Sequence, residues 1–316
     1  MSTTLDDDVL RPTDARFLIK GRGAGGMGAH TYLAARRAEL DALTWTGFDV
    51  TPVGTTIGAE VSGVDLAADL DEAEVAELRR ALVAFKVLFF RDQQLDAATQ
   101  AAFAQRFGPL EVHPFLAGSE DTPELVRFEK DAAVAGYENV WHSDVSWRER
   151  PALGSVLRAI EVPRYGGDTL WADMGAAYLG LLPGVRARID ALEAVHDFTL
   201  SFGQGLDADQ LAAAVELHPP VVHPVVRTHP ESGERILYVN RIFTSHVVGL
   251  DADEGEALLA GLFGAAEVPE YQVRLRWEPG TVAMWDNRST QHYAASDYWP
   301  QRRVMERAAI VGDRPR

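Results

Sequence analysis

The sequence contains no cysteine among its 316 residues. This absence excludes disulfide bonds, thiolate metal sites and cysteine nucleophiles, and it suits a reducing cytoplasm. Long apolar runs are also missing, because the longest, ALVAFKVLFF at 81–90, is interrupted by Lys86 and is far too short to span a bilayer. We therefore expect a globular protein that does not cross a membrane.

Positive charge is scarce as well. The chain has 30 Lys and Arg residues against 47 Asp and Glu residues, which gives a formal net charge of −17. Nucleic acids and anionic membranes are themselves negative, so we expect neither as a partner. The first ten residues, MSTTLDDDVL, are acidic where a signal peptide would be basic and then apolar, which favours a cytoplasmic location. We also expect the chain to form a homo-oligomer.

The pattern of the chain changes at about residue 44. Residues 1–44 predict a partly flexible leader with a short helix over 30–43, whereas residues 45–316 predict one domain. That domain consists of many short strand patterns separated by turns, with helices expected over 71–85, 96–108, 174–193 and 251–264. The pattern favours a mainly β fold with helical inserts, built on a closed or double-layered β core.

A glycine motif in the leader suggests a different function. GRGAGG at 21–26 matches a dinucleotide-binding fingerprint, and Glu39 lies at a suitable distance beyond it. The run before the motif is only ARFLIK, and the segments after it resemble antiparallel strands instead of a βαβ unit. We therefore favour a flexible leader over a nucleotide site.

The segment WHSDVSW at 141–147 places a histidine and a carboxylate two positions apart in a run that resembles a strand. Residues i and i+2 of a strand face the same way, so His142 and Asp144 can converge on one point. Iron(II) oxygenases use two imidazoles and one carboxylate on one side of the ion. The third ligand must then be a distant histidine, and His292 in WDNRSTQHYAA is the best candidate.

A second H-x-E pair, His229 and Glu231, is a weaker candidate. Pro230 and the following SGER predict an exposed hairpin turn, which would keep both side chains away from a buried metal site.

The C-terminal run QRRVMERAAI at 301–310 predicts a strand whose Arg303, Met305 and Arg307 share one face. Two arginines that point inward are costly unless each meets an anion. They could form structural ion pairs, or they could clamp a carboxylate or a sulfonate, because guanidinium offers a planar two-pronged set of donors. Thr169, in GGDTLW, supplies a hydroxyl that could share an anion with Arg303.

Four segments together resemble one known family. WHSDVSW, GGDTLW, HDFTLSF and WDNRSTQHYAASDYWPQRRVMERAAIVGD are similar to the taurine dioxygenase family of Fe(II)/2-oxoglutarate-dependent oxygenases, over residues 45–316. WHSDVSWRERP also resembles the alkylsulfate dioxygenases. The resemblance implies a double-stranded β-helix, or jelly roll, with helical inserts.

The resemblance also implies roles for individual residues. His142, Asp144 and His292 match the iron ligands, and Thr169 and Arg303 match the groups that hold the far carboxylate of 2-oxoglutarate. The substrate-pocket positions are matched by His113, Ser201, Phe202, Phe243 and Arg307, of which Arg307 would hold the anionic head of the substrate. Two positions depart from the family, because Glu138 stands in place of an asparagine and Leu116 in place of a tyrosine.

The implied reaction consumes O₂, decarboxylates 2-oxoglutarate to succinate and hydroxylates a small organic anion. We expect a sulfonate or sulfate ester first, with release of sulfite or sulfate, and an amino-acid-derived carboxylate second. Leu116 favours a longer alkyl or aryl tail, whereas Glu138 would suit a substrate amine. A zinc hydrolase would leave Thr169 and Arg303 without a role, and a non-catalytic β-barrel binding protein would not need an open-sided metal triad.

Overall fold

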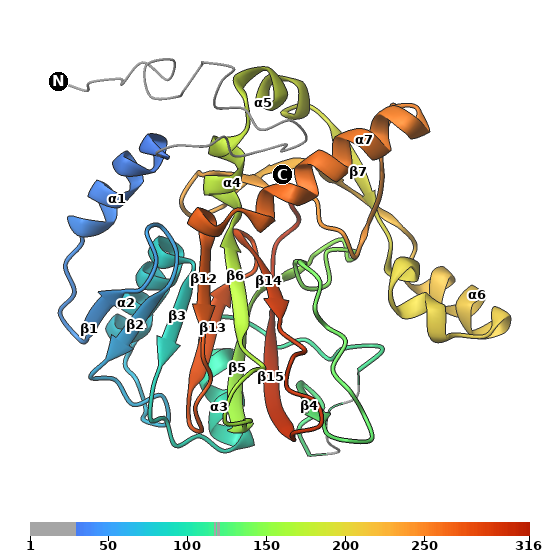
Figure 1. Cartoon of the computed structure of the whole chain (residues 1–316). Coiled ribbons are helices and arrows are strands. Elements are labelled where there is room, and N and C mark those ends of the chain that lie inside the picture. The colour runs from blue at the N-terminus through green and yellow to red at the C-terminus, as the bar shows by residue number, and fades with distance from the viewer. Residues whose placement is uncertain (1–29, 117, 119–120) are drawn as a thin grey trace.

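The computed structural model describes residues 30–116, 118 and 121–316. Its largest element is a seven-stranded sheet with the order β1-β2-β3-β13-β5-β15-β4 (Figure 1). The strands span Asp49–Pro52 (β1), Ala59–Ser62 (β2), Val87–Phe90 (β3), Val282–Asp286 (β13), Ala152–Glu161 (β5), Arg303–Val311 (β15) and Leu125–Lys130 (β4). Neighbouring strands are antiparallel except for β2 and β3, which run parallel.

A second sheet of three antiparallel strands faces the first. It contains β12 (Gln272–Leu275), β6 (Thr169–Asp173) and β14 (Thr290–Ala294). Apolar side chains from both sheets form a common core, in which Trp171 and Val273 of the smaller sheet pack with Phe89, Leu157 and Ala283 of the larger one. The double-layered core predicted from the sequence is therefore confirmed, although the two sheets do not close into a barrel within the described residues.

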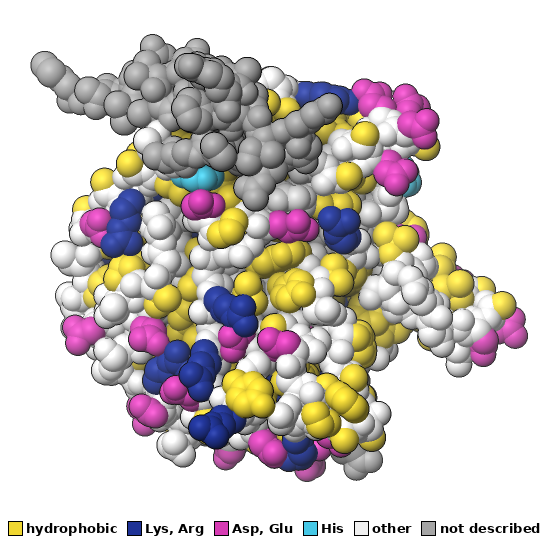
Figure 2. Space-filling model, viewed as in Figure 1, with side chains coloured by type: hydrophobic (Ala, Val, Ile, Leu, Met, Phe, Trp, Pro, Cys, Tyr) yellow, Lys and Arg dark blue, Asp and Glu magenta, His cyan; other side chains and the backbone are white. Residues whose placement is uncertain are grey.

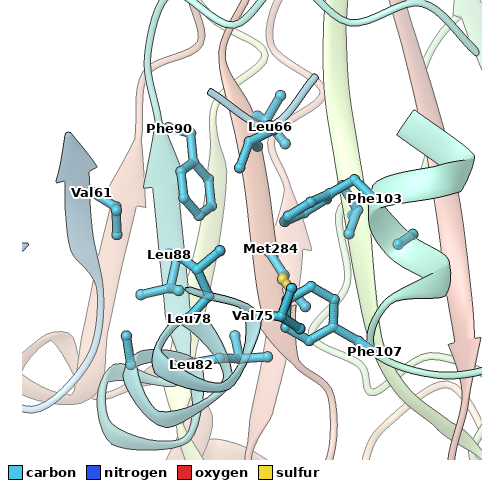
Figure 3. Packing of buried hydrophobic residues seen from close by; sticks show 14 of the residues in the cluster. Val61, Leu66, Val75, Leu78, Leu82, Leu88, Phe90, Phe103, Phe107 and Met284 are labelled. Carbon is cyan, nitrogen blue, oxygen red and sulfur yellow. The ribbon is translucent and has the colours of Figure 1, made fainter. Parts of the chain in front are cut away.

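Two helices cover the outer face of the large sheet. They are α2 (Glu72–Phe85) and α3 (Ala97–Gln105), and their apolar side chains pack on Leu88, Phe90 and Met284 (Figure 3). Helix α2 begins at Asp71, whose carboxylate accepts hydrogen bonds from the backbone of the first turn while Glu74 binds back to the backbone of Asp71. The large sheet is thus buried on both faces, which is why β3 is apolar at every position.

Further helices and two small sheets complete the described part of the chain. The helices are α1 (Ala34–Asp41), α4 (Met174–Gly180), α5 (Pro183–Ile189), α6 (Ala208–Leu217) and α7 (Ala252–Phe263). Two small antiparallel sheets contain β11 (Thr244–Val247), β7 (Glu193–His196) and β8 (Val221–Pro224) in one, and β9 (Val226–Thr228) and β10 (Arg235–Leu237) in the other. Helices and strands take up similar shares of the chain, so the predicted mainly β class is corrected to mixed α and β.

The predicted helices agree with the structure to within a few residues at 71–85, 96–108 and 251–264. The helix expected over 174–193 is in fact α4, α5 and the first residue of β7, because Pro183 begins a new helix. Helix α6, which lies apart from the sheets in Figure 1, was not predicted.

Part of the predicted leader packs on the body of the protein. Leu40 of α1 belongs to the core beneath α2, and Leu33 belongs to a core formed by α4, α7 and the small sheets. The GRGAGG motif lies outside the described residues. The division of the chain at residue 44 stays a prediction.

Acidic and basic side chains are intermixed on the surface. Figure 2 shows Lys and Arg side chains scattered among Asp and Glu on the face that it presents. Ion pairs between exposed or half-buried side chains include Arg302–Glu129 and Arg274–Asp168. Among the described residues, no helix combines the length and the apolar character that crossing a bilayer requires.

Candidate metal centre and adjoining cavity

His142, Asp144 and His292 come together as the sequence predicted. Their ligand atoms all lie within 4.8 Å of one another, and no other group of three or more His, Asp or Glu side chains in the described part of the chain has this spacing. Asp144 Oδ1 is 3.8 Å from Nε2 of His142 and 3.8 Å from Nε2 of His292. Two imidazoles and one carboxylate on one side of a point, with a cavity on the other, suit Fe(II) with open coordination positions.

The segment that contains His142 and Asp144 is not the predicted strand. His142 forms a single β-bridge with His292, through backbone hydrogen bonds of 3.0 and 2.8 Å, and the chain then enters a turn over 144–147. Val145 in that turn has φ +46°, a left-handed conformation that is unusual for a β-branched residue. The turn must therefore be held by contacts from elsewhere.

Asn287 supplies these contacts. Its side-chain amide accepts a hydrogen bond from the backbone N–H of Asp144 at 2.8 Å and donates to the backbone C=O of Asp144 at 3.0 Å and of Ala152 at 3.2 Å. Ser143 donates its hydroxyl proton to the carbonyls of Asn287 and Thr290. The hydrogen bonds of Asn287 thus take the place of the backbone hydrogen bonds between paired strands. They also join the turn to the segment that leads to His292.

The histidines are in the form that a metal requires. The Nδ1 of His142 lies 2.8 Å from the carbonyl of Val140, so Nδ1–H donates and the lone pair of Nε2 faces Asp144. Burial lowers the pKa of His142, and burial together with His142 lowers the pKa of His292 to about 3, so both imidazoles are neutral. Burial alone would raise the pKa of Asp144, but Arg307 and the two histidines hold it below its usual range.

All ten predicted site residues line one cavity of about 970 Å³. They are the three metal-ligand candidates together with His113, Thr169, Ser201, Phe202, Phe243, Arg303 and Arg307. Leu116 and Glu138, the two departures from the family pattern, line it too. Segments that lie almost 200 residues apart in the chain therefore meet in a single chamber beside the metal-ligand candidates.

Two strands of the large sheet form one wall of this cavity. Arg303, Met305 and Arg307 of β15 all line it, so their predicted common face is confirmed. Each is paired across the sheet with a residue of β4 that also lines the cavity, namely Lys130, Phe128 and Val126 respectively.

The sequence prediction missed Lys130. The side chains of Val126 and Phe128 alternate with exposed or half-exposed charged residues in LVRFEK, and Lys130 falls on the apolar face of this alternation. The alternation in the sequence could therefore have indicated that Lys130 is buried. The Nζ of Lys130 is 2.9 Å from a carboxylate oxygen of Glu138, so the two charges form an ion pair.

Arg303 has different contacts. Its Nε donates to the carbonyl of Gly167 at 3.1 Å, its guanidinium lies 5.7 Å from the ring of Tyr298, and its Nη2 is buried without a hydrogen-bond partner among the described residues. Gly167 has φ +69°, and a Cβ there would lie 3.0 Å from the side chain of Arg303, so this glycine is needed for the close approach. Burial lowers the pKa of Arg303.

Arg307 and His113 also line the cavity. Nη1 of Arg307 donates to Oδ1 of Asp144 at 2.7 Å, while its Nε is buried and has no hydrogen-bond partner in the described part of the chain. The Nδ1 of His113 accepts hydrogen bonds from the backbone N–H groups of Phe115 and Leu116, which places the ring proton on Nε2. Burial and the neighbouring Arg307 lower the pKa of His113 to about 3, so it is a neutral donor.

Aromatic rings form the apolar part of this region. Phe202 lies 5.3 Å from His113, 5.2 Å from Phe115 and 6.2 Å from Phe243, measured between ring centroids. Leu116 and Leu200 extend the apolar surface. The predicted residues Phe202 and Phe243 therefore line the same part of the cavity. Phe115 is an additional aromatic residue that was not predicted.

The second H-x-E pair differs from its prediction. The turn between β9 and β10 is present, but His229 is 2 % exposed, and its Nε2 lies 3.0 Å from Oδ2 of Asp286. Asp286 also accepts hydrogen bonds from Arg288, which in turn binds Glu231. The expected exposed position of His229 was wrong, because its side chain turns inward to a carboxylate 57 residues away.

Comparisons with known proteins agree with this geometry. The family described as "Taurine catabolism dioxygenase TauD, TfdA family" matches residues 49–309. An alpha-ketoglutarate-dependent sulfate ester dioxygenase of Pseudomonas putida is 41% identical over 84% of this chain and 90% of its own length. An alkylsulfatase of Acinetobacter baylyi is 37% identical over 81% of this chain and 83% of its own length.

A solved structure is also similar. The crystal structure of a taurine dioxygenase from Burkholderia xenovorans matches with a TM-score of 0.74 and 38% identity, over 85% of this chain and 93% of that one. A zinc hydrolase and a non-catalytic binding protein are thereby set aside. The chain belongs to the TauD, TfdA family and is an Fe(II)- and 2-oxoglutarate-dependent dioxygenase.

Proposed function

We propose that this dioxygenase hydroxylates a small organic anion, with sulfate esters as the preferred class and sulfonates next. Hydroxylation of the carbon that bears the sulfate oxygen gives an unstable product, which collapses to an aldehyde or ketone and free sulfate. One O₂ and one 2-oxoglutarate are consumed for each turnover, and succinate and CO₂ are released. The observation that carries the proposal is the pair of buried arginines on one face of β15, both of which line the cavity together with the metal-ligand candidates.

His142, Asp144 and His292 would hold the iron, which when bound supplies the activation of O₂ coupled to decarboxylation of 2-oxoglutarate. The neutral imidazoles and the ionised carboxylate need no proton change to do so. The carboxylate itself bears on the reaction type, because related halogenases leave this ligand position open for chloride. Asp144 therefore supports hydroxylation. The two facing sheets support the double-stranded β-helix that the family resemblance implies.

Arg303 and Thr169 would hold the far carboxylate of 2-oxoglutarate. Arg303 offers a buried Nη2–H that has no acceptor within the described ranges of the chain, and Thr169 is 2 % exposed at the start of β6 on the same cavity. A buried donor without an acceptor is rare in proteins, and an anion at this point would accept from both groups.

Arg307 and His113 would hold the anionic head of the substrate. The Nε–H of Arg307 has no hydrogen-bond partner among the described residues, and a guanidinium offers a planar set of donors, while the neutral His113 adds an Nε2–H whose position is fixed by two backbone bonds. Ser201, which also lines the cavity, would contribute a hydroxyl. Because the chain carries a net charge of −17, capture of an anion depends on these few donors.

The rest of the cavity suits an apolar tail without an amine. Phe115, Phe202 and Phe243 supply a group of aromatic rings to its lining, and Leu116 adds a branched side chain. Glu138 does face the cavity, but Lys130 already pairs with its carboxylate at 2.9 Å. This pairing removes the reason to expect a substrate ammonium group, so amino-acid-derived carboxylates become less favourable candidates. The homo-oligomer and the cytoplasmic location remain predictions from the sequence.

The test is succinate formation across a matched panel. Alkyl sulfates, alkyl sulfonates, carboxylates and neutral alcohols of equal chain length would be assayed with the wild-type protein and with Arg307→Leu. We expect the sulfates to react fastest and the variant to lose activity on all the anions. Fastest turnover of the neutral alcohols, or equal activity of Arg307→Leu on anions, would contradict the proposal.

A further inference from the structure

We propose that Trp277 is a positioning residue for the cosubstrate, because its indole N–H sets the direction in which Thr169 donates its hydroxyl proton. The inference rests on the proposed function, since it concerns the carboxylate that Thr169 and Arg303 would hold. Trp277 does not itself line the cavity, whereas Thr169 does. Any effect of Trp277 on cosubstrate binding must therefore pass through a neighbour.

The contact between the two residues is specific. Nε1 of Trp277 lies 2.9 Å from Oγ1 of Thr169, and the two residues are 4 % and 2 % exposed. An indole nitrogen can only donate, whereas a hydroxyl has one proton and two lone pairs. The indole therefore occupies one lone pair of Thr169, and the hydroxyl proton must point away from Trp277.

That proton has no acceptor in the part of the chain that the structure describes, where the bond from Trp277 is the one hydrogen bond that the hydroxyl makes. Arg303, on the same cavity, also has a buried donor without an acceptor. An uncommitted threonine hydroxyl could turn its proton toward any nearby carbonyl. The indole occupies one lone pair and so excludes the directions toward Trp277, which leaves the hydroxyl fewer orientations in which to donate before the anion arrives.

The fold explains why Trp277 can act in this way. Leu275, the last residue of β12, is paired directly with Thr169, the first residue of β6, and Trp277 follows two positions later. Its ring packs in the core between the sheets, 6.5 Å from the ring of Trp171. The indole is thus held by packing on a rigid part of the sheet, which suits a group that must fix another side chain.

The matched control is Trp171. It belongs to the same core and is fully buried, but its Nε1 makes no hydrogen bond with any residue that the structure describes, and it does not line the cavity. Replacement of either tryptophan by phenylalanine removes an indole from one apolar cluster. Only Trp277→Phe also removes a donor from Thr169.

The experiment is an anaerobic titration of the Fe(II)-loaded full-length protein with 2-oxoglutarate, followed by its visible charge-transfer band. The proteins are wild type, Trp277→Phe, Thr169→Val, the double variant, Trp171→Phe and Arg303→Leu, each with its thermal unfolding midpoint. We expect Trp277→Phe to weaken 2-oxoglutarate binding by about three- to tenfold, the size of one lost neutral hydrogen bond. The double variant should bind no more weakly than Thr169→Val, and Trp171→Phe should bind like wild type.

The outcomes separate this inference from the proposed function. Wild-type affinity in Trp277→Phe, or a loss that adds in full to that of Thr169→Val, overturns the positioning role. Unchanged affinity in both Thr169→Val and Arg303→Leu overturns the cosubstrate site itself. Thr169→Ser gives a check that does not depend on the folding of a tryptophan variant. It keeps a hydroxyl that the indole can orient, so it should retain most of the affinity, and a loss as large as that of Thr169→Val contradicts the inference.

Discussion

Asn287 binds both backbone polar groups of Asp144, accepting from its N–H at 2.8 Å and donating to its C=O at 3.0 Å. One side-chain amide therefore fixes the turn that presents the carboxylate of the candidate metal centre. Asn287 is 1 % exposed and precedes His292 by five residues, so it couples the two segments from which the candidate ligands come.

Asn287→Ala should weaken metal binding more than the loss of a buried side-chain amide far from the candidate metal centre. It leaves the N–H of Asp144 without a partner, and loss of such support for a ligand typically costs ten- to a hundredfold in metal affinity. The measurement is a competitive titration of Fe(II) or Co(II) together with the free energy of unfolding. Gln100→Ala is the control, because Gln100 is equally buried and donates to two backbone carbonyls on the outer side of the large sheet. Equal metal affinities in the two variants would remove the positioning role.

Asp144→Ala and His292→Ala should each abolish turnover with chloride absent, because each removes one of three donors from the candidate metal centre. Far-ultraviolet circular dichroism should show the same secondary structure as in the wild type. Asp144→Ala also leaves Arg307 without its carboxylate partner, so its unfolding midpoint should fall further than that of His292→Ala. Full activity in either variant would show that the ligand set is different.

Arg303→Leu should reduce the affinity for 2-oxoglutarate steeply. It leaves a carboxylate without a charged donor in a confined site, a loss on the order of 2–5 kcal/mol when the partner stays buried. Arg303→Lys keeps the charge but loses the planar pair of donors, so its affinity for 2-oxoglutarate should lie between those of the wild type and Arg303→Leu. The charge-transfer titration measures both variants. Wild-type affinity in Arg303→Leu would mean that Lys130 or another cation holds the cosubstrate.

His223 should make the protein less stable in mild acid. Burial lowers its pKa from 6.5 to about 4, so the folded form keeps this imidazole neutral over a range in which the unfolded chain binds a proton. The free energy of unfolding should therefore decrease as the pH falls from 6.5 to about 4, by up to about 3 kcal/mol from this group. His223→Asn should show a shallower decrease in urea unfolding over the same range. Parallel curves for the two proteins would contradict this assignment.

Deletion of residues 1–29 should leave the rate of turnover within a few-fold. Deletion of residues 1–44 should destabilise the protein, because it removes Leu33 and Leu40, which are 5 % and 3 % exposed in two apolar cores. The comparison of the two truncations by thermal unfolding and by succinate formation tests the predicted boundary at residue 44. A folded but inactive product of the shorter deletion would place a functional role in residues 1–29.

The fold was predictable where a local pattern determines an element. Asp71 and Glu74 mark the start of α2, and the alternation along β15 correctly places Arg303 and Arg307 on one face. Helix α6 also carries a start signal, a capping box between Asp207 and Gln210, that the sequence prediction did not use.

The residues of the site were predictable from the sequence, but the backbone conformation that presents them was not. His142 and Asp144 do converge, although the segment is a bridge followed by a turn, because the hydrogen bonds of Asn287 act across 143 positions of sequence. The inward position of His229 depends in the same way on Asp286. Such long-range hydrogen bonds leave no periodic trace, and therefore a single sequence does not reveal them.

The two arginines of β15 have a geometric consequence for the product. Four residues of a strand span roughly 13 Å, so the sheet sets a fixed distance between the anion held by Arg303 and the anion held by Arg307. Under the proposed function, Arg303 holds the cosubstrate and Arg307 holds the anionic head of the substrate. The distance of the oxidised carbon from the anionic head is then fixed, whatever the length of the tail. Homologous alkyl sulfates of different length should accordingly be oxidised at the same carbon.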